Sequence, residues 1–551
     1  MPDRYVSHQT NKERKITMGQ FIDSLGGGGS SEIPDGTITT PKLADKCVTT
    51  PKVGDGAITG IKIADDSIST PKMVDASVTT PKIANASVTN EKVVSITGDK
   101  ISDYSLSDMS YDIEDLKGIV GYTDDNIIGI MVDYENKTYT RLGAARGKTM
   151  GADFDAFPMF GGRKRCNVAD NGTINAYYGD EDYVEDGSNG QVMVYQPKFY
   201  YKVIPLKLDP ITDSIGYHLR KAIYYVTDTP KTGFKLHPAF KDVNGNEIPY
   251  VLDSAYEGCI FDVSAADGEG TYLTEDEQVG SFTATTGDKL SSIAGVKPAS
   301  GLTQSLTRPN AEQIAKNRGD GWHNDNIFIE SMTQLLMLIE CGTCNFQTTL
   351  GSGVTGITDN SAYNCSSLTG STSSLGNASG KAASTVNTIN GTPTTNTSEN
   401  KVSVSYRGKE NPYGNIWKFV YGINIHGNGS QRGGIPYIAT DYNWVESKNT
   451  DNYVSAGFTL ANANGYASAF GYGNPEFDWL FMASETTGNS SLPVGDYTYV
   501  TANLNGYRIA CVGGRWGNGT SAGGFCWACS NGVGYRYRYI GARLAFVPTA
   551  S

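Results

Sequence analysis

Residues that could carry out covalent chemistry are few and scattered in this sequence. Cys526 and Cys529 form a Cys-x-x-Cys pair, a spacing that binds zinc when a second pair accompanies it and that supports redox cycling in some enzymes. No second pair follows. The five histidines lie far apart, and no His-Glu-x-x-His spacing occurs. These patterns predict neither a metal ion nor a cofactor.

Paired carboxylates are another route to catalysis, because glycan cleavage needs two of them about 5–10 Å apart. Two pairs are close in sequence: Asp441 with Glu446, and Glu476 with Asp478. Nothing beyond proximity in sequence marks them, and no Gly-x-Ser-x-Gly motif with triad partners occurs. We therefore expect no catalytic residues and a protein that is not an enzyme, with a glycan depolymerase as an alternative.

Residues suited to non-covalent recognition crowd into positions 515–539, which read RWGNGTSAGGFCWACSNGVGYRYRY. Tyr, Trp, Arg and Asn dominate binding hot spots, because rings stack on a ligand while Arg and Asn give directed hydrogen bonds. If YRYRY is a strand, either its tyrosines or its arginines point outward. The alternative is an ordinary hairpin with partly buried tyrosines. The candidate ligand-binding residues are Arg515, Trp516, Asn518, Phe525, Trp527, Asn531, Tyr535, Arg536, Tyr537, Arg538 and Tyr539, with Tyr442 and Trp444 in a second aromatic stretch.

The scaffold for these residues should consist mostly of strands and turns. Glycine accounts for 65 of 551 residues and tyrosine for 33, whereas charged residues make up 19%. Glycine and asparagine supply the positive φ angles of tight turns, and aromatic and β-branched runs such as 191–208 and 217–226 favour strands. Pro309 predicts a helix start, and an apolar stripe over 329–339 predicts an amphipathic helix that ends near Gly342. We expect a mainly β fold with a few helices (α+β).

Three short segments near the C-terminus suggest how the scaffold is built: GNIWKFV at 414–420, VGGRW at 512–516 and IGARLAF at 540–546. Asn415 should form a tight turn whose amide satisfies buried backbone groups. Trp417 should be a core residue, and Arg543 should pair with a buried carboxylate or with carbonyls.

In this order the three segments resemble the formylglycine-generating-enzyme-like family, whose fold is a variant of the C-type lectin fold. The resemblance implies that the segments pack together in one receptor-binding domain over 191–551, with a Ser/Thr/Gly-rich insert at 351–402. Gly517 and Asn518 stand where the oxygen-using enzymes of that family have their copper-binding cysteines. The chain is more similar to retroelement-diversified phage tropism determinants, which implies that 515–539 forms the ligand-facing surface.

A ten-residue repeat spans 33–95, with a β-branched residue at its first position and an apolar one at its sixth from Ile38 onward. Proline in four of the decads excludes a continuous helix. One apolar residue in five cannot form a core in a single chain, so we expect an oligomeric shaft, most plausibly a homotrimer, similar to phage tail-fibre repeats. A disordered linker is the alternative. Residues 1–32 would be a tail-anchoring segment with a Gly-rich joint, and 96–190 a β-rich neck.

Charge and hydropathy restrict the partners. The net charge of −13 argues against nucleic acid, and no stretch of about 18 apolar residues would span a membrane. The first twenty residues lack the apolar segment of a signal peptide, so we expect synthesis in the host cytoplasm.

These patterns together predict a phage tail fibre or receptor-binding protein, located in the virion. Its N-terminus would contact tail or baseplate proteins, and its C-terminal loops a glycan or protein of the bacterial surface. A purely structural tail or collar subunit is the other alternative.

Overall fold

The computed structural model describes residues 96–97, 110–111, 113–264, 269–273, 287–301, 306–358, 365–389, 392–447 and 452–550. The chain divides into two compact units, 1–89 and 90–551, and every described residue belongs to the second. The predicted anchoring segment (1–32) and decad shaft (33–95) lie outside the described residues, so the shaft and its trimeric assembly stay predictions.

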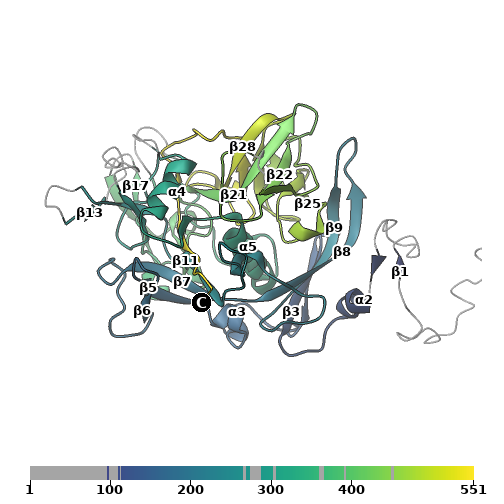
Figure 1. Ribbon diagram of the computed structural model, residues 1–551, viewed down its shortest axis with the longest axis horizontal. Coiled ribbons are helices and arrows are strands. Elements are labelled where there is room, and N and C mark those ends of the chain that lie inside the picture. Colours follow the sequence, from purple (N-terminus) through teal and green to yellow (C-terminus); the bar gives the residue numbers. More distant parts are fainter. Residues whose placement is uncertain are drawn as a thin grey trace, which may run out of the picture. The chain divides into compact units, whose positions relative to one another are not determined.

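Strands dominate the described residues and helices are few, as the composition predicts. Four helices occur in this part of the chain: α2 (Ile113–Val120), α3 (Pro158–Gly161), α4 (Arg308–Lys316) and α5 (Ile327–Cys341). Figure 1 shows α5 in the middle of this unit, with strands of the larger sheets around it.

The first large sheet of the described residues is built around a long hairpin. Strand β9 pairs with β8 along one edge and with β3 and β25 along the other, all antiparallel. Its strands are β10 (Lys235–Leu236), β8 (Tyr200–Pro210), β9 (Tyr217–Thr227), β25 (Ala469–Tyr472), β26 (Ala483–Glu485), β3 (Ile127–Asp133) and β4 (Thr138–Gly143).

The second large sheet is antiparallel and brings the C-terminal strand against much earlier ones. Strand β31 inserts between β15 and β11. In spatial order the strands are β15 (Trp322–Asn324), β31 (Leu544–Phe546), β11 (Tyr250–Ser254), β7 (Gln191–Pro197), β5 (Lys164–Val168) and β6 (Ile174–Tyr177).

These two sheets correct the predicted boundary at residue 190. Strand β3 pairs with β9, and β5 pairs with β7, so residues 127–177 share sheets with the region beyond 190. The prediction of a separate neck over 96–190 is therefore wrong for residues 127–177, because their apolar side chains are buried in the same cores as those of the later strands.

The third large sheet carries the C-terminal motifs. In order its strands are β23 (Tyr453–Ser455), β22 (Ile435–Ala439), β21 (Trp417–Asn428), β28 (Asn505–Val512), β29 (Trp527–Cys529), β27 (Tyr497–Val500) and β24 (Gly465–Tyr466), with β30 (Ile540–Gly541) parallel to β21. Lys418 lies opposite both Val512 and Gly541. The three motifs therefore lie side by side, as predicted, although the C-type lectin fold itself stays a prediction.

The local roles predicted for the motif residues are confirmed. Asn415 has φ 60°, and its side-chain oxygen accepts a hydrogen bond from the Ser367 backbone N–H at 2.7 Å. Trp417 is buried, and the buried Arg543 guanidinium donates to the Glu410 carbonyl.

Smaller pairings complete the described strands, and those over 380–396 lie within the predicted Ser/Thr/Gly-rich insert. They are β12 (Cys259–Asp262) with β13 (Thr271–Tyr272) and β14 (Lys289–Ser291); β19 (Val404–Tyr406) with β16 (Gly380–Lys381) and β20 (Lys409–Glu410); β17 (Thr385–Ile389) with β18 (Thr392–Asn396); and β1 (Ile96–Thr97) with β2 (Ser110–Tyr111).

Helix α5 begins and ends where the sequence predicts. The Asn326 side chain accepts hydrogen bonds from two backbone N–H groups of the first turn, and Gly342 ends the helix with φ 70°. Every residue of the helix is buried, so its polar side chains are covered as well as the predicted apolar stripe. Its acidic residues have buried cationic partners: Glu330 pairs with Lys409 at 3.0 Å, and Glu340 with Arg407 at 2.6 Å.

Candidate functional site

Partly exposed tyrosines and arginines from four segments meet at the end of the third sheet. We call this set the Tyr–Arg surface. It comprises Tyr466, Tyr497, Tyr499, Arg515, Asn518, Tyr535, Arg536, Tyr537, Arg538 and Tyr539. Tyr537 is the most exposed aromatic side chain of the set, with an exposed fraction of 42%.

Strand geometry positions the first tyrosines. Side chains alternate along β27, so Tyr497 and Tyr499 share the half-exposed face while Thr498 and Val500 are buried. Tyr466 lies opposite Tyr497 on the neighbouring strand, with ring centroids 5.1 Å apart. The Tyr497 and Tyr499 rings are 4.7 Å apart. The three rings therefore form one contiguous aromatic area on a paired sheet.

A glycine-rich turn connects these rings to Arg515. Gly513 and Gly514 have φ 97° and 81°, a backbone conformation that other residues rarely adopt. The Asn518 side-chain oxygen accepts the Arg515 backbone N–H at 2.8 Å, which closes the turn. The Asn518 amide nitrogen donates to the Tyr499 hydroxyl at 3.0 Å. Asn518 thus holds the turn against β27.

The final tyrosines extend the same area. The Arg515 guanidinium lies over the Tyr539 ring at 4.5 Å, a distance at which a cation is attracted to the ring face. Tyr537 and Tyr539 have centroids 4.5 Å apart, and the Tyr535 and Tyr539 hydroxyls are 3.1 Å apart. The Arg538 guanidinium lies 5.6 Å from the Tyr537 ring. Side-chain contacts therefore run without a break from Tyr466 to Arg538.

Residues 535–539 do not form the strand that the alternation in YRYRY predicts. Backbone hydrogen bonds hold them as a loop instead: the Tyr537 carbonyl accepts from Gly301 and from Ile540, both at 3.1 Å. These residues are not paired in a β-sheet, so their side chains do not alternate between two faces. Tyrosines and arginines can therefore contact one another.

Two phenols of this surface, those of Tyr499 and Tyr535, are held in their neutral form by their surroundings. Burial raises the pKa of Tyr499 to about 12. Burial and the hydrogen bond to Tyr539 raise the pKa of Tyr535. Each ring therefore offers an apolar face together with an uncharged hydroxyl.

Three residues predicted to contact a ligand are core residues instead. Trp516, Phe525 and Trp527 have no exposed surface. Trp527 donates from its indole nitrogen to the Phe481 carbonyl at 2.8 Å, and the Phe525 ring packs at tilted angles against Phe346, Phe470 and Phe481. Trp516 packs in a small core with Val354, Ile357, Cys365 and Ile416. Their interpretation as ligand contacts is wrong, because segments distant in sequence cover them. Asn531 is partly buried on the loop that follows β29.

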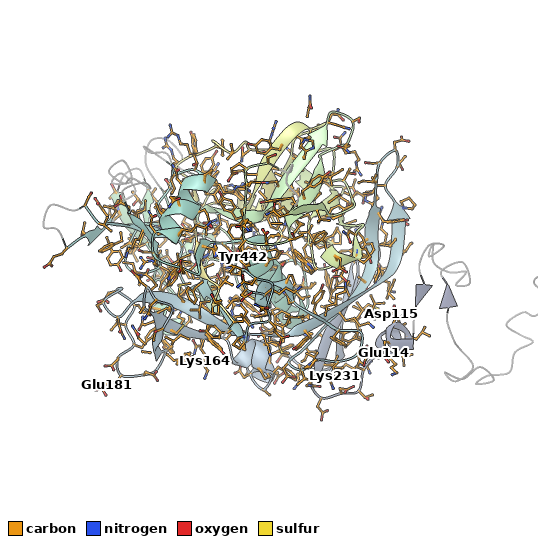
Figure 2. All side chains as sticks on the ribbon, viewed as in Figure 1. Glu114, Asp115, Lys164, Glu181, Lys231 and Tyr442 are labelled. Atoms are coloured by element: carbon orange, nitrogen blue, oxygen red, sulfur yellow. The ribbon has the colours of Figure 1, made fainter. Side chains whose placement is uncertain are left out.

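Tyr442 and Trp444 belong to a different cluster. Trp444 stacks on Tyr421 with centroids 5.1 Å apart, and both Trp444 and Tyr442 contact the His323 ring. Tyr442, labelled in Figure 2, is buried, so its predicted role as an exposed contact is also corrected. It forms part of the floor of a cavity of about 420 Å³, with Phe328 and Trp479.

Members of the carboxylate pairs suggested by sequence proximity are bound to other side chains. Glu446 bonds with Arg308 and the Tyr421 hydroxyl, away from Asp441, which accepts from Asn443 and Asn452. Asp478 accepts from Tyr201 and Lys235, and burial raises its pKa to about 6. Asp441 and Glu476, one member of each pair, line the same 420 Å³ cavity.

The Cys-x-x-Cys thiols are inaccessible. Cys526 and Cys529 are buried and unpaired, and burial raises the pKa of each thiol, which disfavours the thiolate that metal binding and redox exchange need. Over the described part of the chain, no group of three His, Cys, Asp or Glu side chains is arranged to hold a metal ion.

Sequence reasoning missed Tyr466, Tyr497 and Tyr499. The signal for two of them was present, because a Tyr-x-Tyr alternation in a strand places both rings on one face. Tyr466 joins them only through pairing between β24 and β27, which are thirty residues apart in the chain and carry no shared motif.

No family model matches the chain, and no curated protein matches it. Among solved structures, similarity is found to three variants of the Major Tropism Determinant. The P3c and M1 variants are each 12% identical to this chain, and 70% of this chain aligns with 71% of theirs. The U1 variant is 11% identical, and 70% of this chain aligns with 72% of its length. The TM-score is 0.23 in all three superpositions, which is too low to carry an argument about fold or function. None of the helices in the described residues is long and apolar enough to cross a membrane.

Proposed function

We propose that this protein is a phage-type tail fibre or receptor-binding protein, and that its Tyr–Arg surface attaches the virion to a bacterial host. One observation carries the proposal: partly exposed tyrosines on paired strands and tyrosines and arginines on the adjoining loops form one contiguous set. Isolated exposed rings are ordinary on protein surfaces, but a contiguous group of this composition is typical of binding sites.

The mechanism is adsorption without chemistry on the ligand. The tyrosines present apolar ring faces and hydroxyl groups, and the arginines present charged guanidinium groups. Hydrogen bonds from Asn518 and the backbone hold the loops in place, so little entropy is lost when a ligand binds. If the decads form a trimeric shaft anchored to the tail by residues 1–32, three such surfaces bind together and gain avidity.

The test is binding of the fluorescently labelled full-length protein to a panel of Gram-negative and Gram-positive strains. A triple variant, Tyr497→Ala, Tyr537→Ala and Tyr539→Ala, should lose most of the binding that the wild type shows. The matched control is Tyr177→Ala with Lys164→Ala, which removes an exposed tyrosine and an exposed lysine (Figure 2 labels Lys164) from the second sheet. Absence of binding to every strain, or equal binding by the triple variant, would contradict the proposal and favour a structural tail or collar subunit.

The depolymerase alternative has one observation in its favour, a cavity whose lining includes both Asp441 and Glu476 as well as four aromatic residues. A depolymerase would release new reducing ends from capsular polysaccharide of a bound strain. It would lose this activity in an Asp441→Asn, Glu476→Gln variant. Steady release by the wild type but not by that variant would replace adsorption with catalysis as the proposed function.

A further inference from the structure

The Tyr–Arg surface differs in charge from the rest of the protein. The chain carries a net charge of −13, yet no aspartate or glutamate follows Asp496. The last 55 residues contain five arginines and no lysine: Arg508, Arg515, Arg536, Arg538 and Arg543. Arg543 is buried in the core, whereas Arg515, Arg536 and Arg538 are partly or fully exposed in the Tyr–Arg surface. A basic region therefore lies at the proposed binding site of an acidic protein.

The acidic residue next to this segment adds no negative charge to it. Asp496 is fully buried and accepts a hydrogen bond from the Phe525 backbone N–H at 2.7 Å. Burial raises its pKa well above the ordinary value, so the carboxyl favours its neutral form. No member of the Tyr–Arg surface is a carboxylate.

Two guanidinium groups of this surface lie against tyrosine rings, which leaves the edges of the guanidinium planes to bind acidic groups. A guanidinium that stacks on a ring keeps its N–H donors directed outward around its edge, where they match the two oxygens of a carboxylate or phosphate. Arg515 stacks on Tyr539 and Arg538 lies against Tyr537.

The extent of the surface favours a polymer over a small ligand. Ring-to-ring and ring-to-guanidinium steps of 4.5–5.1 Å join Tyr466 to Tyr499 and Arg515 to Tyr537, and Asn518 connects the two groups. Successive sugar rings can place their apolar faces on such rings while their acidic substituents meet the arginines.

From this charge and this extent, we infer that the Tyr–Arg surface binds an anionic polysaccharide, a chain of sugars that carries carboxylate or phosphate groups. The inference rests on the proposed function and names its ligand class. The net negative charge of the whole chain opposes approach to an anionic cell envelope, whereas the basic Tyr–Arg surface is attracted to it.

The first experiment measures binding of the full-length protein to matched polymers by biolayer interferometry. Polygalacturonate carries one carboxylate on each sugar, its fully methyl-esterified form has the same backbone without charge, and poly(glycerol phosphate) supplies phosphate. At least one charged polymer should bind about tenfold or more tightly than the ester, and the preferred polymer identifies carboxylate or phosphate as the acidic group. An Arg536→Gln, Arg538→Gln variant should lose about tenfold in affinity, whereas a Lys164→Gln control should lose none. Equal binding of the ester and both charged polymers, or no binding of any, would overturn the inference.

A second experiment separates failure of the inference from failure of the proposed function. Cells that bind the protein are treated with periodate, which oxidises sugars, or with protease. Loss of binding after periodate, together with weaker binding when salt is raised from about 50 to about 500 mM, supports an anionic polysaccharide. Loss after protease alone would assign a protein receptor and overturn the inference, while the adsorption function would stand. If the tyrosine variant binds cells like the wild type, the proposed function fails.

Discussion

Trp527 and Tyr537 lie ten residues apart in the same aromatic segment, yet the structure assigns them opposite roles. Trp527 has no exposed surface and donates a hydrogen bond to the Phe481 carbonyl, whereas Tyr537 is 42% exposed. Replacing each with alanine should therefore separate stability from binding.

The expected magnitudes follow from these environments. Truncation of a buried tryptophan leaves a cavity and costs about 3–5 kcal/mol, and the unpaired Phe481 carbonyl adds about 1–3 kcal/mol. Trp527→Ala should thus lower the free energy of unfolding by about 4 kcal/mol or more. Tyr537→Ala removes one ring contact with Tyr539 and one with Arg538, and should cost less than about 1 kcal/mol. Its binding to cells should nevertheless fall about tenfold or more, as for a hot-spot residue.

The assay is urea unfolding followed by circular dichroism, paired with cell binding of each variant at a temperature where it is folded. A Trp527→Phe variant serves as a milder control, because it keeps one six-membered ring while it loses the indole donor and the fused five-membered ring. If Tyr537→Ala destabilised the protein by more than about 2 kcal/mol, or Trp527→Ala left stability unchanged, the assignment of core and surface would be refuted.

Three further results are expected. Burial lowers the pKa of His237 to about 3, so the unfolded chain takes up a proton that the folded chain refuses between about pH 6.5 and 3, and stability falls over that window by up to about 4–5 kcal/mol. Urea midpoints of His237→Phe should fall less on acidification than those of the wild type, and parallel profiles would contradict the burial. Burial raises the pKa of Asp478 to about 6, so the folded chain keeps a proton that the unfolded chain releases near pH 4, and wild-type stability should fall by about 3 kcal/mol relative to Asp478→Asn as pH rises from 4 to 6. A constant difference between the two proteins over that range would exclude the raised pKa. Gly342→Ala should cost about 1–2 kcal/mol because φ is 70° and the added methyl meets Arg141, whereas Gly532→Ala, with open space around it, should be neutral in the same unfolding assay; equal costs would show that the helix end does not require glycine.

Features set by nearby residues could be predicted from the sequence. The runs at 191–208 and 217–226 form β7, β8 and β9, because their aromatic and β-branched residues favour strands whatever their partners. Pro309 lies in the first turn of α4, and Gly342 ends α5. The packing of the three C-terminal motifs side by side was implied by their resemblance to the formylglycine-generating-enzyme-like family.

Features set by distant residues could not be predicted. In the sequence, the acidic residues of α5 look like a solvent-exposed face. In the structure they pair with Arg407 and Lys409, which lie more than sixty residues later in the chain. From the sequence alone, Trp516 and Tyr539 are equally good candidates for ligand contact. Trp516 is buried because the segments around Val354 and Ile416 pack over it. For the same reason Tyr466 could not be assigned to the site before its strand pairing was known.

The most direct test of the central claim is site-specific photocrosslinking. A photoreactive phenylalanine analogue at Tyr537 should crosslink the full-length protein to a component of the bacterial surface upon irradiation, and the same analogue at Tyr177 should not. Crosslinking from Tyr177 alone, or from neither position while the protein stays bound to cells, would show that attachment occurs elsewhere on the molecule.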